Sequence, residues 1–153
     1  MSEAESAAGK PESPRVQTCK QWYAAFNSRR LDALMALFDE HPRVSIGAGG
    51  SGTVVPYAGT FEGRENVRWY YQMRFEQKSD DDKDVTGPLD PERKMRPFCM
   101  IEKAPLECEN WVIICARMRD HKGISGYDGP YVHVFGFRGT GLQIASLDMF
   151  FAR

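Results

Sequence analysis

The run Pro130–Arg138 (PYVHVFGFR) and the run Leu142–Ala152 (LQIASLDMFFA) decide the fold of this chain. Both are rich in β-branched and aromatic residues, which favour strands. A short Gly-Thr-Gly connection lies between them. Such a connection between two strand-like runs predicts a tight antiparallel hairpin.

Further elements are predicted on the N-terminal side of this hairpin. Ser13 and Pro14 resemble a helix start, with serine as the cap and proline in the first turn. Apolar residues at helical spacing follow, and two similar patterns occur farther along the chain. The expected elements are helices over 14–28, 31–38 and 64–75, and strands over 43–47, 96–103, 110–119, 130–138 and 142–152.

This order of elements predicts the α+β class, with helices over the concave face of a curved antiparallel sheet. A chain of 153 residues and 17.4 kDa has room for one domain. We expect a disordered tail over 1–13, because those residues are small and polar without an apolar period. The domain then spans 14–153, with a charged loop inserted at 77–94.

Composition excludes several classes of function. Twenty basic and twenty-one acidic residues give a net charge of −1, which argues against nucleic acid and anionic membranes as partners. The four cysteines include no C-x-x-C pair, so we expect reduced thiols in a cytoplasmic protein. No second histidine is spaced to join His133 in a ligand set, so we predict no metal and no other cofactor.

The predicted hairpin brings two ionisable residues together. His133 shares one strand face with Tyr131 and Phe135, and Asp148 shares a face of the next strand with Ser146 and Phe150. Because a tight turn joins the strands, His133 and Asp148 can face one another. A base, an orienting partner and a cavity are the minimum parts of an acid–base site.

Each of these residues also has a purely structural interpretation. Asp148 lies in an apolar strand, so it is either at a cavity wall or a structural carboxylate that pairs with Arg117 or a backbone group. His133 could be a core histidine held by one hydrogen bond. Arg117 and Arg119 could stabilise an enolate or carboxylate, or could reach solvent from the strand end.

Several segments resemble a known family. The segments 22–27 (WYAAFN), 31–38 (LDALMALF) and 55–67 (VPYAGTFEGRENV) are similar to the first half of SnoaL-like proteins, and 132–150 is similar to their closing hairpin. These proteins belong to the nuclear transport factor 2-like superfamily. The resemblance covers about residues 15–153, except the charged loop. It implies a cone-shaped α+β barrel, in which three helices cover a strongly curved antiparallel sheet and a pocket lies at the open end.

The resemblance also implies chemistry. Members include polyketide cyclases, ketosteroid isomerases, scytalone dehydratases, limonene epoxide hydrolases and non-catalytic modules, and these enzymes use acid–base chemistry without a metal. His133 falls where the isomerases place an oxyanion-binding aspartic acid, and Asp148 where the epoxide hydrolases place the aspartate that activates water. Arg117 matches the arginine of their Arg-x-Asp pair, but Arg119 replaces its aspartate. The isomerase base has no match near 43–47.

The first hypothesis is therefore a cofactor-independent isomerase or lyase of the cyclase or dehydratase type. Its substrate would be an apolar, carbonyl-bearing molecule such as a polyketide or terpenoid intermediate of secondary metabolism. Asp148 would move the proton, His133 would orient Asp148 or donate to the oxyanion, and Arg117 would stabilise negative charge. The expected substrate-binding residues are Tyr57, Trp111, Tyr131, Phe135, Arg119, Ser146 and Phe150.

The second hypothesis is a non-catalytic module that binds a small ligand or dimerises. On either hypothesis we expect a homodimer through the outer face of the sheet, because apolar side chains there would need a partner. The residues assigned to this face are Val132, Val134, Leu147, Met149 and Phe151.

Overall fold

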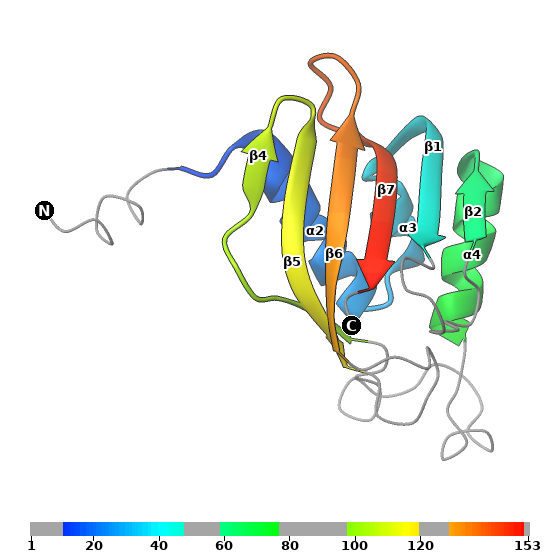
Figure 1. Cartoon of the computed structure of the whole chain (residues 1–153). Coiled ribbons are helices and arrows are strands. Elements are labelled where there is room, and N and C mark those ends of the chain that lie inside the picture. The colour runs from blue at the N-terminus through cyan, green and yellow to red at the C-terminus, as the bar shows by residue number, and fades with distance from the viewer. Residues whose placement is uncertain (1–10, 48–58, 77–97, 120–128, 152–153) are drawn as a thin grey trace, which may run out of the picture.

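The computed structural model describes residues 11–47, 59–76, 98–119 and 129–151. The predicted loop at 77–94 and most of the predicted tail at 1–13 lie outside these ranges. The described residues form three helices and a curved, unclosed sheet of seven strands, which confirms the α+β prediction and the cone type of fold. Figure 1 shows the sheet in front, with α2 and α3 behind it and α4 beside the β2 edge.

The helices begin where the sequence signals predict. Helix α2 spans Pro14–Asn27, and the Ser13 hydroxyl accepts a hydrogen bond from the Val16 N–H at 3.2 Å. Helix α3 spans Leu31–Met35 and is shorter than predicted, because the chain enters the first strand at Phe38. Helix α4 spans Arg64–Glu76.

The sheet has the order β2-β1-β7-β6-β5-β3, and β4 pairs with β5 beside β3. All neighbours are antiparallel except β1 and β7, which run parallel. The sequence did not predict β2 and β4, which are short strands without an alternating burial pattern. The strands are β1 Phe38–Gly47, β2 Gly59–Glu62, β3 Phe98–Ile101, β4 Leu106–Cys108, β5 Trp111–Arg119, β6 Gly129–Phe137 and β7 Ile144–Phe151.

A one-residue irregularity separates the start of β7 from the rest of the strand. Phe137 pairs with Ile144, but the next residue of β6, Gly136, pairs with Ser146. Ala145 is therefore the extra residue of a β-bulge. Beyond the bulge, every residue of β7 lies on the opposite face from the one that simple alternation assigns to it.

The face of the sheet that packs against the helices carries most of the core. On β6 it presents Tyr131, His133 and Phe135, and on β7 it presents Leu147, Met149 and Phe151. The prediction that the last three residues lie on the outer face is therefore wrong. Only Val132 and Val134 of the predicted outer set lie there, and both are partly exposed.

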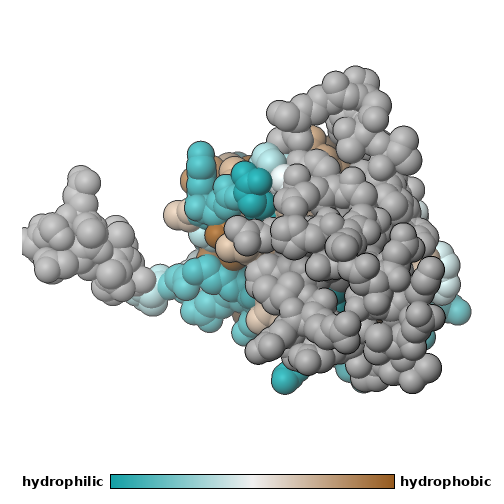
Figure 2. Space-filling model, turned by 90° about the horizontal axis from the view of Figure 1, so that it is seen from below, coloured by the Kyte–Doolittle hydropathy of each residue, from teal (hydrophilic) through white to brown (hydrophobic). Residues whose placement is uncertain are grey.

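Hydrogen bonds from two arginine side chains link helices α2 and α4 to turns and strand ends of the sheet. Arg15 of α2 donates hydrogen bonds to the carbonyls of Gly141 and Gly139 in the β6–β7 turn and to that of Glu109 in the β4–β5 turn. Arg64 at the start of α4 donates to the carbonyls of Met35, Phe38 and Asp39. Seen from below, the described part of the surface is mainly hydrophilic, with smaller hydrophobic areas between (Figure 2).

Candidate functional site

His133 occupies the centre of the inner face of the sheet. It is the middle residue of β6 and has no exposed surface. Its cross-strand neighbours are Ile114 on β5 and Met149 on β7, which are also buried. A polar ring is therefore held among apolar side chains, where it must find its hydrogen bonds within the protein.

Four aromatic side chains surround the His133 ring. Tyr131 and Phe135 lie on the same strand face, with centroids 4.5 and 5.3 Å from the imidazole. Trp22 and Tyr23 of α2 approach from the helix layer, at 5.0 and 5.5 Å. All but Tyr23 meet the imidazole nearly edge to face, so packing fixes the ring plane.

One nitrogen of His133 is bonded and the other is not. The Tyr23 hydroxyl lies 2.5 Å from Nδ1, whereas Nε2 is buried without a hydrogen-bond partner among the described residues. Burial lowers the pKa of His133 to about 3, so the imidazole is neutral at physiological pH. Burial also raises the pKa of Tyr23 well above its usual value, so this residue keeps its proton. We assign the Tyr23 O–H as donor to Nδ1, which places the imidazole proton on Nε2.

A second buried tyrosine, Tyr131, lies beside the hydrogen-bonded pair of Tyr23 and His133. The Tyr131 hydroxyl is buried near the Tyr23 hydroxyl and the Cys99 thiol, but it forms no hydrogen bond of normal geometry. Burial raises the pKa of Tyr131, and burial likewise raises the pKa of Cys99 to about 12. Both groups are therefore protonated near neutral pH. They are weak nucleophiles but available hydrogen-bond donors.

The helix layer adds two more buried polar atoms. Trp22 Nε1 and the Tyr71 hydroxyl have no hydrogen-bond partner of normal geometry among the described residues. Burial raises the pKa of Tyr71, and the nearby indole N–H of Trp22 opposes that effect. The two rings lie 6.1 Å apart. We call Trp22, Tyr23, Tyr71, Tyr131 and His133 the inner polar cluster.

Sequence patterns found only part of this cluster. Tyr131 and His133 were predicted as site residues, whereas the sequence patterns assigned no site role to Trp22, Tyr23 and Tyr71. The available signal was that all three are aromatic residues with a polar group on the buried side of their helices, a feature that Tyr70 of α4 shares.

Asp148 does not join the inner polar cluster. It pairs across the strands with Val134, not with His133, so its side chain lies on the outer face. The prediction that Asp148 and His133 face one another is therefore wrong, and the bulge at Ala145 is the physical reason. The Asp148 carboxylate lies 3.4 Å from the Arg43 guanidinium, which fits its interpretation as a paired structural carboxylate but with a different arginine from the predicted Arg117.

The structure divides the other predicted site residues between the two faces. Phe135 is buried on the inner face, beside His133. Arg117 lies on the outer face, where its Nε is 2.5 Å from the Glu102 carboxylate. Tyr57 and the side chain of Arg119 lie outside the described residues. The predicted residues that also lie on the outer face are Trp111, Ser146 and Phe150.

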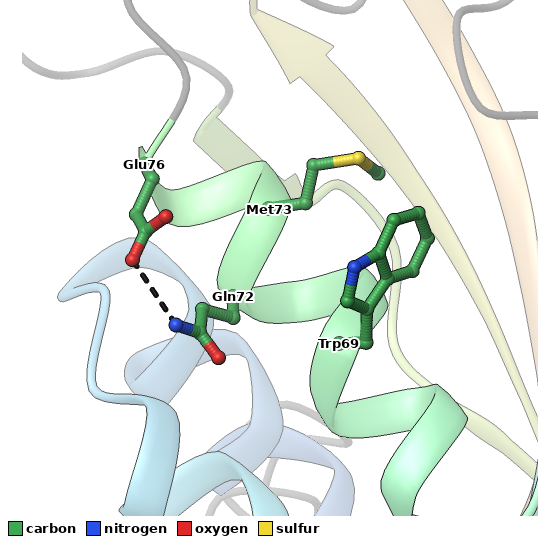
Figure 3. A pocket seen from close by; sticks show the side chains of 4 residues that line it. All are labelled: Trp69, Gln72, Met73 and Glu76. Atoms are coloured by element: carbon green, nitrogen blue, oxygen red, sulfur yellow. Dashed lines mark hydrogen bonds between the residues drawn. The ribbon is translucent and has the colours of Figure 1, made fainter.

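A hollow on α4 is separate from the inner polar cluster. It has a volume of about 350 Å³, and its described lining is Trp69, Gln72, Met73 and Glu76, a stripe along one side of the helix (Figure 3). The Gln72 amide donates to the Glu76 carboxylate at 3.2 Å. Glu76, the only charged residue in the described lining, is thus already hydrogen-bonded. The hollow therefore offers fewer polar groups for catalysis or ligand binding than the inner polar cluster.

The described residues contain no group of three or more histidine, cysteine or acidic side chains that could hold a metal ion. They also contain no helix long and apolar enough to cross a membrane. The buried described residues include no carboxylate, and the buried polar or charged ones are Thr18, Arg74 and His133.

Comparison with solved structures identifies the fold. A Catenulispora acidiphila protein with a ketosteroid isomerase-like fold, solved with trimethylamine, matches with a TM-score of 0.61 and 17% identity over 88% of this chain and 85% of that one. A SnoaL-like protein of unknown function from Burkholderia thailandensis matches with a TM-score of 0.60 and 18% identity over 94% and 100%. A candidate polyketide cyclase from Sinorhizobium meliloti matches with a TM-score of 0.57 and 11% identity over 87% and 93%.

The chain therefore has the nuclear transport factor 2-like fold that SnoaL-like and ketosteroid isomerase-like proteins share, as the sequence resemblance predicted. At these identities the likeness concerns the fold. No family model matches the sequence, and no curated protein is a close enough match to count as a relative.

Proposed function

We propose that this protein is a metal-independent isomerase or lyase that acts on a small, mostly apolar molecule with a carbonyl group. The carrying observation is the state of His133, which is fully buried with Nδ1 bonded to Tyr23 and Nε2 left without a described partner. A buried polar atom without a hydrogen bond is unfavourable unless a ligand or water supplies that bond. Here the substrate oxygen would accept the hydrogen bond from Nε2.

The proposed role of His133 is that of an electrophile. With Tyr23 donating to Nδ1, the neutral imidazole presents an N–H at Nε2. That N–H donates to the carbonyl oxygen, and the bond strengthens as negative charge develops there during enolisation or elimination. The low pKa of about 3 makes His133 a weak base, which favours donation over proton removal.

Tyr23 is proposed as a positioning residue, because it acts through the imidazole. Its raised pKa keeps the hydroxyl proton in place, so the tautomer of His133 stays fixed during the reaction. The buried described residues supply no carboxylate to remove a carbon-bound proton. The inner polar cluster thus supplies the electrophilic part of the reaction. The candidate polyketide cyclase among the solved structures supports this reaction class by its fold.

A second candidate is a module that binds such a molecule without turnover. The lack of a carboxylate among the buried described residues favours this candidate, since the isomerases that the sequence resembles need a base. Both candidates use the same hydrogen-bond donors, so they differ in turnover and not in the site.

Three variants test the assignment once a ketone or enone panel yields a bound or converted compound. His133→Gln keeps an N–H donor near the place of Nε2, and His133→Phe keeps the ring without a donor. We expect His133→Phe to lower kcat roughly 100- to 1000-fold, as loss of one oxyanion donor does, and His133→Gln to lower it less. Asp148→Asn should leave kcat unchanged.

The results also separate the two candidates. Binding that weakens in His133→Phe, without turnover by the unaltered protein, would establish the binding module. Full turnover by His133→Phe would refute both candidates. Loss of turnover in Asp148→Asn would show that the active site includes Asp148 on the outer face.

We also propose that the outer face pairs two copies of the chain. The described outer face carries the exposed apolar side chains Met100, Leu106, Trp111 and Phe150, on strands β3, β4, β5 and β7. Such a set favours a partner surface. Light scattering should show a dimer, and Trp111→Arg should convert it to a monomer with an unchanged circular dichroism spectrum. A monomeric unaltered protein would refute this pairing.

A further inference from the structure

Four polar atoms of the inner polar cluster lack a hydrogen-bond partner among the described residues: Trp22 Nε1, the Tyr71 and Tyr131 hydroxyls, and His133 Nε2. Two of them lie on different layers of the fold, His133 Nε2 on the sheet side and the Tyr71 hydroxyl on the α4 side. Both side chains are almost completely buried, at 0% and 1% exposure. Trp22 contacts both rings, with centroids 5.0 Å from His133 and 6.1 Å from Tyr71.

Each of these two groups is a hydrogen-bond donor that no described residue accepts from. On the sheet side, Tyr23 donates to Nδ1 and leaves the N–H at Nε2. On the helix side, the Tyr71 hydroxyl is unpaired, and the indole N–H of Trp22, which can only donate, cannot accept its proton. Burial keeps Tyr71 protonated by raising its pKa.

We propose that the ligand of this protein carries two hydrogen-bond acceptors on one small apolar frame, the first bound by His133 and the second by Tyr71. A dicarbonyl compound or its enol has this arrangement. This inference rests on the proposed function, because it takes His133 as the contact to the first acceptor. It adds a specificity residue, Tyr71, which lies on a different element of the fold.

The neighbouring tyrosine provides a matched control. Tyr70 is also on α4 and 4% exposed, but its hydroxyl interacts with the Arg74 guanidinium. Tyr71→Phe removes an unpaired hydroxyl, whereas Tyr70→Phe removes a paired one. We therefore expect Tyr71→Phe to keep or raise the Tm, and Tyr70→Phe to lower it.

The binding test compares two probes with the same carbon frame by calorimetry on the full chain. Benzoylacetone has two carbonyl groups, and butyrophenone has one. We expect benzoylacetone to bind the unaltered protein roughly tenfold more tightly, as one further hydrogen bond allows. In Tyr71→Phe the two probes should bind equally, with the affinity for butyrophenone unchanged, whereas Tyr70→Phe should keep the preference.

The outcomes separate this inference from the proposed function. Equal affinities of the unaltered protein for both probes, with weaker binding in His133→Phe, would refute the role of Tyr71 and leave the role of His133 intact. A preference for benzoylacetone that survives in Tyr71→Phe would also refute it. Binding of neither probe to the unaltered protein would count against both proposals.

Discussion

The two faces of β6 and β7 place similar residues in opposite surroundings. On the inner face, Phe135 has no exposed surface and packs against Tyr23 and His133. On the outer face, Phe150 is 46% exposed. The same strands thus supply both a core that contains an imidazole with one unpaired nitrogen and a surface that carries apolar side chains. The position of the bulge at Ala145 decides which residues of β7 belong to which face.

The strongest way to break this division is to insert one alanine between Ser146 and Leu147. The inserted residue would take the position of Leu147 opposite Phe135 and would move Asp148 opposite His133. Leu147 and Met149 would then leave the core, and burial of each such side chain contributes about 1.5–3 kcal/mol. Burying the carboxylate without a partner would add several kcal/mol.

We therefore expect the insertion to abolish cooperative unfolding, because the whole stability of a domain is about 5–15 kcal/mol. Circular dichroism during thermal unfolding measures this. Insertion of one alanine after Thr140, in the exposed turn between the two strands, is the control and should leave a cooperative transition. A cooperative transition in the variant with the insertion after Ser146 would show that the strand absorbs the extra residue and that its register is not fixed.

The bulge also explains how much the sequence could predict. The cap at Ser13, the apolar stripes of the helices and the alternating strands are local signals, and each gave the right element. The facing of His133 and Asp148 depends on the register of two strands, which a single extra residue reverses. Ala145 carries no signal of its own, because alanine between Ile144 and Ser146 fits an ordinary strand.

Two exchanges of phenylalanine for alanine compare the faces directly. Phe135→Ala should destabilise the protein by about 3–5 kcal/mol, because it leaves a cavity beside His133. Phe150→Ala on the outer face should destabilise a monomer by less than about 1 kcal/mol. Urea unfolding at low protein concentration measures both. Similar losses in the two variants would contradict the assignment of the faces.

The buried imidazole should give the protein an acid-sensitive stability. The pKa of His133 falls from about 6.5 in the unfolded chain to about 3 in the folded protein. As pH falls from about 6.5 toward 3, the unfolded chain takes up a proton that the folded protein excludes. This group therefore lowers the free energy of unfolding by about 1.4 kcal/mol per pH unit in that window.

Urea unfolding at pH 7, 6 and 5 measures this slope. In His133→Phe the contribution should vanish, so the difference in stability between the variant and the unaltered protein should change with pH. The His41→Phe exchange is the control, since His41 is exposed on β1. A pH-independent difference for His133→Phe would show that the folded protein accepts the proton.

The smallest effect is expected at Asp148, the residue on which the sequence-based site depended. Its carboxylate is 3.4 Å from Arg43, and the two side chains are 24% and 45% exposed. An ion pair this open to water contributes at most about 1 kcal/mol, and salt screens it. Asp148→Asn should therefore lower the stability only slightly, and the difference should shrink further in 1 M salt. A loss as large as that of Phe135→Ala would mean that Asp148 is buried, which is the arrangement that the bulge prevents.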